Sequence, residues 1–160
     1  AKVGFADDAF LGGLMHNSAG IVEMQFDRNK LIEIVQTLGV NGEGVPANDM
    51  RAVEAQVFGA DHQDFGKGLC EKWKFPSNFS LVTGFHHNPT EAPADNRRLP
   101  AMVYVADRLV GAVDGQFRLD LTTLEIDPAV LDILNLTETG LHSIRERVDE
   151  EITAAAGLLG

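Results

Sequence analysis

The sequence predicts an all-α fold, a multi-helix bundle, and three observations support this prediction. Apolar residues recur three and four positions apart in most segments, which is the spacing of one helix face. The alternation of apolar and polar residues that is typical of strands is scarce. Residues that start or stop helices stand at the ends of the periodic segments. With 160 residues, 44% of them hydrophobic, the chain is expected to form one domain with a substantial core.

The first half of the chain is predicted to contain three helices, over residues 6–26, 29–38 and 50–73. Asp7 and Asp8 favour the start of the first helix, because carboxylates stabilise the positive end of a helix dipole. Gly20 is a candidate interruption of that helix. Gly39 is a stop signal for the second helix, and Asp49 is a cap for the long third one. The segment between Gly39 and Asp49 is predicted to be a loop.

Four helices are predicted in the second half, over residues 77–87, 99–113, 129–134 and 137–156. Pro76 ends the long third helix, because proline cannot continue a helix. Asn88 ends the next helix, since it precedes Pro89 and a residue before proline avoids the α region. Residues 114–127 are predicted to be irregular, and Pro128 opens the short helix that follows them.

The charge of the chain argues against binding to nucleic acids or to anionic membranes. There are 24 Asp and Glu residues against 13 Lys and Arg, which gives a net charge of −11 and repels phosphate groups. No run of about 18 apolar residues is present, so no membrane span is predicted. The start lacks the basic and apolar regions of a signal peptide. The single cysteine, Cys70, excludes an internal disulfide and fits a reducing compartment, so we expect a cytoplasmic protein.

Five polar residues stand where helical spacing or a helix end predicts a position inside the bundle. These candidate metal ligands are His16, His62, His86, His87 and Asp107. His62 follows Phe58 by four positions on the apolar stripe of the long helix. Asp107 follows Val103 by four positions at the margin of another stripe, while Arg108 is predicted to point away. Because facing helices of a bundle often build such sites, and imidazole with carboxylate suits iron, zinc or manganese, we expect these residues to converge.

Each of these candidates also has a purely structural interpretation. His62 can be a core histidine that is hydrogen-bonded to a backbone carbonyl. His86 or His87 can end a helix, where a cation meets the negative end of the dipole. Asp107 can cap a helix or pair with an arginine. The remaining histidine, His142, lies in a polar helix and is predicted to be solvated.

Several segments resemble the motifs of one protein family. Residues 10–22, FLGGLMHNSAGIV, resemble the FLAGLLHDIGKLVL signature of the HD superfamily. Residues 54–76 match a family pattern at Glu54, Gly59, His62, Gly66, Leu69, Trp73, Phe75 and Pro76. FHHNP at 85–89 and LPAMVYVADRLV at 99–110 continue the same order. Together these segments resemble the HDOD domain, a relative of the HD and HD-GYP phosphohydrolases, over most of residues 5–113.

The resemblance implies an HD-like bundle and a single HDOD-like domain over residues 1–160. In catalytic relatives, histidines and aspartates at matching positions bind divalent metals that activate water for attack on a phosphate ester. Carried over by position, the ligands are again His16, His62, His86, His87 and Asp107.

The chain departs from the catalytic pattern in three ways. Asn17 replaces the bridging aspartate of the HD pair, so that an amide stands where the family has a carboxylate. The Gly-Tyr-Pro motif that follows the histidine pair in cyclic-di-GMP phosphodiesterases is absent from residues 88–98. The first histidine of the metal site, together with the family's N-terminal helical part, is expected upstream of Phe5. Losing an anionic bridge and a ligand weakens a two-metal site.

These departures favour a non-catalytic regulatory or signal-transduction module that acts through contacts with other signalling proteins or domains. No cofactor is expected unless the site is retained, in which case it is iron, zinc or manganese. The alternative is a metal-dependent phosphohydrolase or cyclic-nucleotide phosphodiesterase, and a third interpretation is a non-catalytic nucleotide or metal sensor. Since Ala1 replaces an initiator methionine, we expect a processed piece or an excerpt of a longer protein. A partial bundle exposes apolar faces, which favours a homo-oligomer or contact with its missing part.

Overall fold

The structure is a computed structural model that describes residues 2–42, 45–113 and 119–159, and side chains within residues 6–155. Its helices are α1 (Lys2–Met15), α2 (Ala19–Phe26), α3 (Arg28–Leu38), α4 (Met50–Phe58), α5 (His62–Lys72), α6 (Ser77–Phe85), α7 (Arg98–Gly111), α8 (Pro128–Leu134) and α9 (Glu138–Leu159). The 3₁₀ turns η1 (Pro89–Glu91) and η2 (Ala94–Asn96) join α6 to α7. Within the described ranges one isolated bridge, Val40 to Pro46, is the only strand-type pairing, so the prediction of an all-α bundle is confirmed.

The first predicted helix, over residues 6–26, is interrupted at a different place from the one predicted. A turn at residues 16–18 separates α1 from α2, whereas Gly20 lies inside α2. Asp7 and Asp8 do not mark the helix start, because α1 begins before them. The turn places the histidine–asparagine pair at the end of α1, next to the interior of the bundle.

The prediction of one long helix over residues 50–73 is wrong, because the chain forms two helices there. Gly59, with a φ of +87°, takes the left-handed conformation that ends α4. Asp61 then caps α5, since its side chain accepts a hydrogen bond from the backbone N of Asp64 at 3.0 Å. His62 therefore begins α5 and does not lie in the middle of a continuous helix.

Other helix ends agree with the sequence. Asp49 caps α4 by accepting a hydrogen bond from the backbone N of Arg51 at 2.9 Å. Gly39 follows α3 with a φ of +59°, and Pro128 opens α8. None of the described helices combines the length and the apolar character that crossing a membrane requires.

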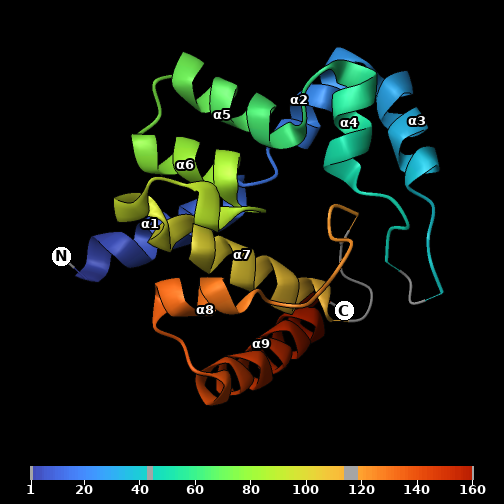
Figure 1. The fold of residues 1–160 in the computed structure, drawn as a ribbon. Coiled ribbons are helices and arrows are strands. Elements are labelled where there is room, and N and C mark those ends of the chain that lie inside the picture. The colour runs from blue at the N-terminus through green and yellow to red at the C-terminus, as the bar shows by residue number, and fades with distance from the viewer. Residues whose placement is uncertain (1, 43–44, 114–118, 160) are drawn as a thin grey trace.

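Apolar side chains of the described residues pack in three clusters, and two of these lie against α7, which runs through the middle of the molecule (Figure 1). α1 and α6 contact α7, and α8 and α9 cover its other side (Figure 1). The cluster between α7, α8 and α9 contains Ala101, Tyr104, Val105, Leu109, Val130, Leu131 and Leu141. The cluster between α3 and α4 contains Ile34, Leu38, Met50 and Val53. The cluster between α6 and α7 contains Val82, Leu99 and Val103.

The described segment that follows α7 is held by buried contacts. Arg108 was predicted to point away, but it is buried, because its Cζ lies 3.4 Å from the Tyr104 ring centroid and its Nε donates to the Glu125 carbonyl at 3.2 Å. Leu119 packs against the α3–α4 cluster, and Leu121 is 1% exposed. The backbone between these two leucines is thereby fixed against the helices.

Candidate metal centre

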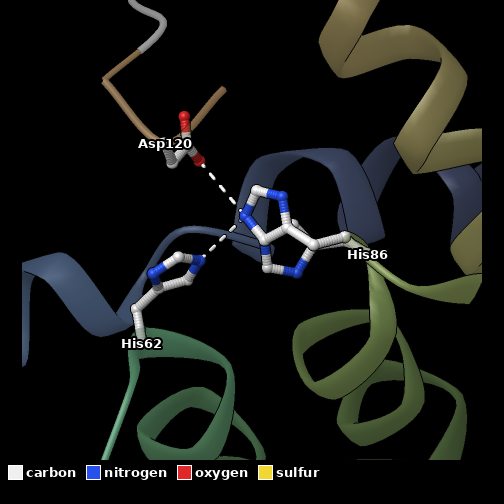
Figure 2. Close-up of side chains that lie close together, drawn as sticks. His62, His86 and Asp120 are labelled. Carbon is white, nitrogen blue, oxygen red and sulfur yellow. Dashed lines mark hydrogen bonds and ion pairs between the residues drawn. The ribbon is translucent and has the colours of Figure 1, made fainter. Parts of the chain in front are cut away.

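Four potential metal ligands from distant parts of the sequence meet inside the molecule. They are His62, His86, His87 and Asp120, and one nitrogen or oxygen atom from each lies within 4.8 Å of the others. His62 is the first residue of α5, the two adjacent histidines follow the end of α6, and Asp120 lies on the segment after α7. Figure 2 shows the labelled side chains of His62, His86 and Asp120 pointing toward a common point.

The ring of His62 is oriented by the carboxylate of Glu54. Glu54 Oε2 lies 2.9 Å from the backbone N of His62 and 2.7 Å from its Nδ1, and both side chains are buried. Burial lowers the pKa of His62, but the hydrogen bond and the charge of Glu54 outweigh this effect and raise it. Because Nδ1 faces a carboxylate, the proton resides there, and Nε2 faces the other ligands.

The ring of His86 is held as a neutral imidazole. Its Nδ1 donates to the carbonyl oxygens of Val82 and Thr83, at 3.2 and 3.1 Å. Burial lowers the pKa of His86 well below its usual value, and the neighbouring histidines, His87 first among them, add to this shift. Its Nε2 is buried and has no hydrogen-bond partner among the described residues. The lone pair of Nε2 is therefore free to bind a cation.

His87 lies between His62 and Asp120. Its Nε2 lies 2.9 Å from Nε2 of His62 and 3.6 Å from Oδ2 of Asp120, as the dashed lines in Figure 2 mark. Two imidazole nitrogens bound to one tetrahedral zinc ion at 2.0–2.1 Å are about 3.3 Å apart. The two Nε2 atoms, which share a hydrogen bond in this structure, thus lie slightly closer together than a shared metal ion would hold them.

Asp120 supplies an ionised carboxylate. Burial raises its pKa, but the hydrogen bond and charge of His87, together with the hydrogen bond from Asn17, outweigh burial and lower it below the usual range. Asn17 Nδ2 donates to Oδ2 of Asp120 at 2.8 Å. Oδ1 of Asp120 is buried and has no hydrogen-bond partner in the described part of the chain.

The predicted ligands His16 and Asp107 form a separate pair beside this group. The His16 ring lies 5.0 Å from the His86 ring between centroids, but its Nδ1 bonds the Gly13 carbonyl at 2.6 Å. Its Nε2 lies 3.6 Å from Oδ1 of Asp107. Three of the five predicted residues thus join the group of four, and these two lie next to it. The fully solvated position predicted for His142 agrees with a side chain that is 71% exposed.

Asp120 and Glu54 are the residues of this site for which the sequence predicted no role. Glu54 was part of the family pattern, but nothing in the spacing predicted that it would orient His62. Asp120 lies in a stretch predicted as irregular, where no helical period relates it to the other ligands. The one local signal is that it stands between two leucines, Leu119 and Leu121.

A small cavity adjoins the group. Its volume is about 60 Å³, and it is lined by Asn17, Gly20, Glu23, Met50, Glu54, His62 and Asp120. Glu23 is 2% exposed, and neither of its carboxylate oxygens has a partner among the described residues. Burial, followed by the charge of Glu54, raises the pKa of Glu23 to about 7. A much larger groove of about 710 Å³ runs between residues 122–131 and α9, and none of the group of four lines it.

Comparison with known proteins places the first part of this site within a family. The sequence model of the HDOD domain family matches residues 1–89, which include His62, His86 and His87 but not Asp120. An uncharacterized protein of Treponema pallidum (strain Nichols) is 24% identical over 109 residues, which are 68% of this chain. They are 20% of that protein, so the chain spans about a fifth of the length of this curated relative. No solved structure matches the chain.

Proposed function

Because the chain belongs to the HDOD domain family, we propose that it is a regulatory domain that acts through contacts with other proteins and does not hydrolyse phosphate esters. The observation that carries this proposal is the size of the space beside the histidines. The cavity there measures about 60 Å³, whereas pockets for small-molecule ligands measure roughly 300–1,000 Å³. A nucleotide therefore does not fit next to the candidate ligands.

The burial of the ligands supports the same proposal. His62, His86 and His87 are 3%, 1% and 9% exposed, and Asp120 is 8% exposed. Hydrolysis needs the scissile phosphorus atom to lie within bonding reach of a metal-activated water. Side chains from α5, the end of α6 and the segment after α7 converge on the group, and their low exposure limits the access of substrate to it in the described part of the chain.

The apolar surface of the first two helices supports a role in protein contact. Phe10 and Leu14 on α1, and Ile21 and Phe26 on α2, are each more than half exposed. Phe10 and Leu14 lie one turn apart on the same face of α1, and neighbouring exposed apolar side chains of this kind are typical of interaction sites. We propose self-association or docking of a signalling partner through this surface, in a protein that acts in the cytoplasm.

The first experiment tests for hydrolysis. The purified chain is loaded with Mn²⁺, Fe²⁺ or Zn²⁺ and incubated with cyclic dinucleotides and with bis(p-nitrophenyl) phosphate. We expect no turnover above that of the His86→Ala variant. His142→Ala, which removes an exposed histidine far from the group, is the matched control.

A second candidate function is a metal-dependent phosphohydrolase or cyclic-nucleotide phosphodiesterase. Three imidazoles around one point favour it, because three histidines with a bound water form the catalytic zinc site of some hydrolytic enzymes. This function requires the group to open to substrate. Metal-dependent turnover that His86→Ala abolishes and His142→Ala leaves intact would establish it and overturn the regulatory proposal.

The contact surface has its own test. Sedimentation equilibrium of the wild-type chain is expected to detect self-association that Phe10→Ser with Leu14→Ser weakens. Val40→Ser, which removes an exposed apolar side chain from the loop after α3, is expected to leave the association unchanged. A wild-type chain that stays monomeric at all accessible concentrations, and binds no receiver or output domain, would contradict this part of the proposal.

A further inference from the structure

The position of the only carboxylate in the group of four raises a question about the family's metal site. The resemblance puts the metal-binding carboxylate at position 17, where this chain has an amide. That amide donates a hydrogen bond to Asp120, a residue 103 positions further along the chain. A carboxylate therefore lies beside residue 17, but it belongs to a different segment of the chain.

We propose that Asp120 is the carboxylate ligand of a single transition-metal ion, and that the Nε2 atoms of His62, His86 and His87 are the other three protein ligands. Asn17 positions this carboxylate from outside the coordination shell. The ion is one that favours imidazole with one carboxylate, such as Zn²⁺ or Fe²⁺. The inference goes beyond the regulatory role proposed above and does not depend on it, since an ion can be held with or without hydrolysis.

Two residues of the group carry buried atoms without a hydrogen-bond partner in the described part of the chain, which supports a bound cation. Nε2 of His86 and Oδ1 of Asp120 are both buried without a hydrogen-bond partner among the described residues. A buried polar atom without a partner destabilises the folded chain. His86 and Asp120 each contribute one atom to the group whose ligand atoms lie within 4.8 Å of one another, and the Asp120 oxygen that faces His87 is Oδ2, at 3.6 Å, so one ion can bind both residues.

The orientation of the histidine rings also supports a bound metal ion. The ring centroids of His86 and His87 lie 4.3 Å apart, and those of His62 and His87 lie 5.0 Å apart. The Nδ1 atoms of His62 and His86 are each engaged outside the group, by a carboxylate and by backbone carbonyls. This arrangement, in which an outer acceptor fixes the tautomer, is how proteins prepare imidazoles to bind a metal through Nε2.

The charges balance around a divalent ion. The Asp120 carboxylate binds directly and contributes one negative charge, and the Glu54 carboxylate behind His62 contributes a second. The imidazoles are neutral when they are ligands. A buried dication is thereby compensated by two nearby carboxylates, which removes the main cost of placing it in the interior.

The segment that carries Asp120 is firm enough to supply a ligand. Leu119 packs against the α3–α4 cluster, Leu121 is almost fully buried, and Arg108 of α7 bonds the carbonyl of Glu125. These contacts fix the backbone on both sides of Asp120. An ion bound at this place would tie the segment after α7 to α5 and to the end of α6.

Metal binding to the purified chain tests the proposal directly. After equilibration with Zn²⁺ and dialysis, elemental mass spectrometry is expected to find about one equivalent of zinc in the wild type. Titration calorimetry is expected to show at least about a 100-fold loss of affinity in Asp120→Asn, since removal of a ligand exceeds the 10–100-fold effect of an outer partner. Glu125→Gln, which changes an exposed carboxylate on the same segment, is the control and should bind as the wild type does.

A second variant tests whether residue 120 binds the ion directly or only positions other ligands. Its expected result is a new spectroscopic signal and not a loss of affinity. In Asp120→Cys loaded with Co²⁺, a thiolate bound to the ion produces an intense near-ultraviolet charge-transfer band. We expect this band in Asp120→Cys, and we expect it to be missing from Asn17→Cys and from the wild type, whose Cys70 is buried elsewhere. Zinc well below one equivalent in the wild type, unchanged affinity in Asp120→Asn, or the band in Asn17→Cys alone would each overturn the proposal.

Discussion

One carboxylate oxygen, Oε2 of Glu54, accepts hydrogen bonds from both the backbone N and the ring Nδ1 of His62, at 2.9 and 2.7 Å. The first bond satisfies a free N–H at the start of α5, and the second fixes the tautomer of the ring. Glu54, in the middle of α4, thus fixes both the start of α5 and the orientation of the His62 ring. Its effect on metal binding follows from this double role.

Glu54→Gln is predicted to weaken Zn²⁺ binding about 10–100-fold, because the amide is a poorer acceptor and removes the charge that balances the ion. Titration calorimetry with Zn²⁺ measures the effect. Glu33→Gln, an exposed change on α3, serves as the control and should leave the affinity as it is. Equal affinities for the wild type and Glu54→Gln would mean that the ring orientation does not depend on this carboxylate.

Glu23 is predicted to make the metal-free protein less stable as pH rises. Its pKa is raised from an ordinary value of 4.5 to about 7, mainly by burial and then by the charge of Glu54. The folded state therefore holds a proton that the unfolded state has lost between these two values, so the free energy of unfolding falls as pH rises through this window. At one pKa unit per 1.36 kcal/mol, the full penalty is roughly 3 kcal/mol above the window.

The matching variant is Glu23→Gln, which is neutral at every pH. In EDTA it is expected to raise the free energy of unfolding at about pH 8 and to change it little at about pH 4.5, as urea denaturation at the two pH values can measure. Glu33→Gln should give the same small difference at both. If Glu23→Gln destabilised the chain equally at both pH values, the carboxyl group would have a packing role and its ionisation would not matter.

The helices could be predicted from the sequence more completely than their interruptions. Apolar spacing continues across the junction between α4 and α5, so it indicated one helix, although Gly59 and Asp61 there were a stop and a start signal. The choice between a continuous and a broken helix was decided by tertiary contacts. Above all, Glu54 folds back to bond the backbone of His62.

The candidate site could be predicted only in part for a related reason. The histidines of the group lie at helix ends, where short motifs in the sequence mark them. Asp120 lies where the chain has no repeating pattern, and its approach to Asn17 depends on the path of the chain after α7. Periodicity relates residues of one element, and it does not relate residues that meet from separate elements.

His16 and Asp107 are predicted to influence stability more than metal content. The Nε2 of His16 faces Asp107 at 3.6 Å, and its Nδ1 bonds the backbone carbonyl of Gly13, so both nitrogens have neighbours outside the group of four. His16→Gln is expected to retain about one equivalent of zinc by elemental mass spectrometry, whereas His86→Ala is expected to lose it. Loss of zinc in His16→Gln would add His16 to the ligands.

The packing of α5 against α6 is predicted to decide whether the histidines can meet. Gly66 lies one turn after His62 and faces Thr83, which lies one turn before His86 and His87. A Cβ atom at Gly66 would stand 3.0 Å from the Cβ of Thr83, so an alanine there forces the two helices apart. Gly66→Ala is expected to lower the free energy of unfolding by about 1–3 kcal/mol.

A second glycine on the same helix provides the control. A Cβ at Gly68 would meet no atom within 4 Å, so Gly68→Ala is expected to raise the free energy of unfolding by about 0.5–1 kcal/mol through helix propensity alone. Urea denaturation in EDTA gives both values, and Zn²⁺ titration gives the affinities. Because only Gly66→Ala separates His62 from the histidines after α6, it alone should weaken Zn²⁺ binding. Equal stability changes and equal affinities in the two variants would show that α5 and α6 can shift apart without disturbing the site.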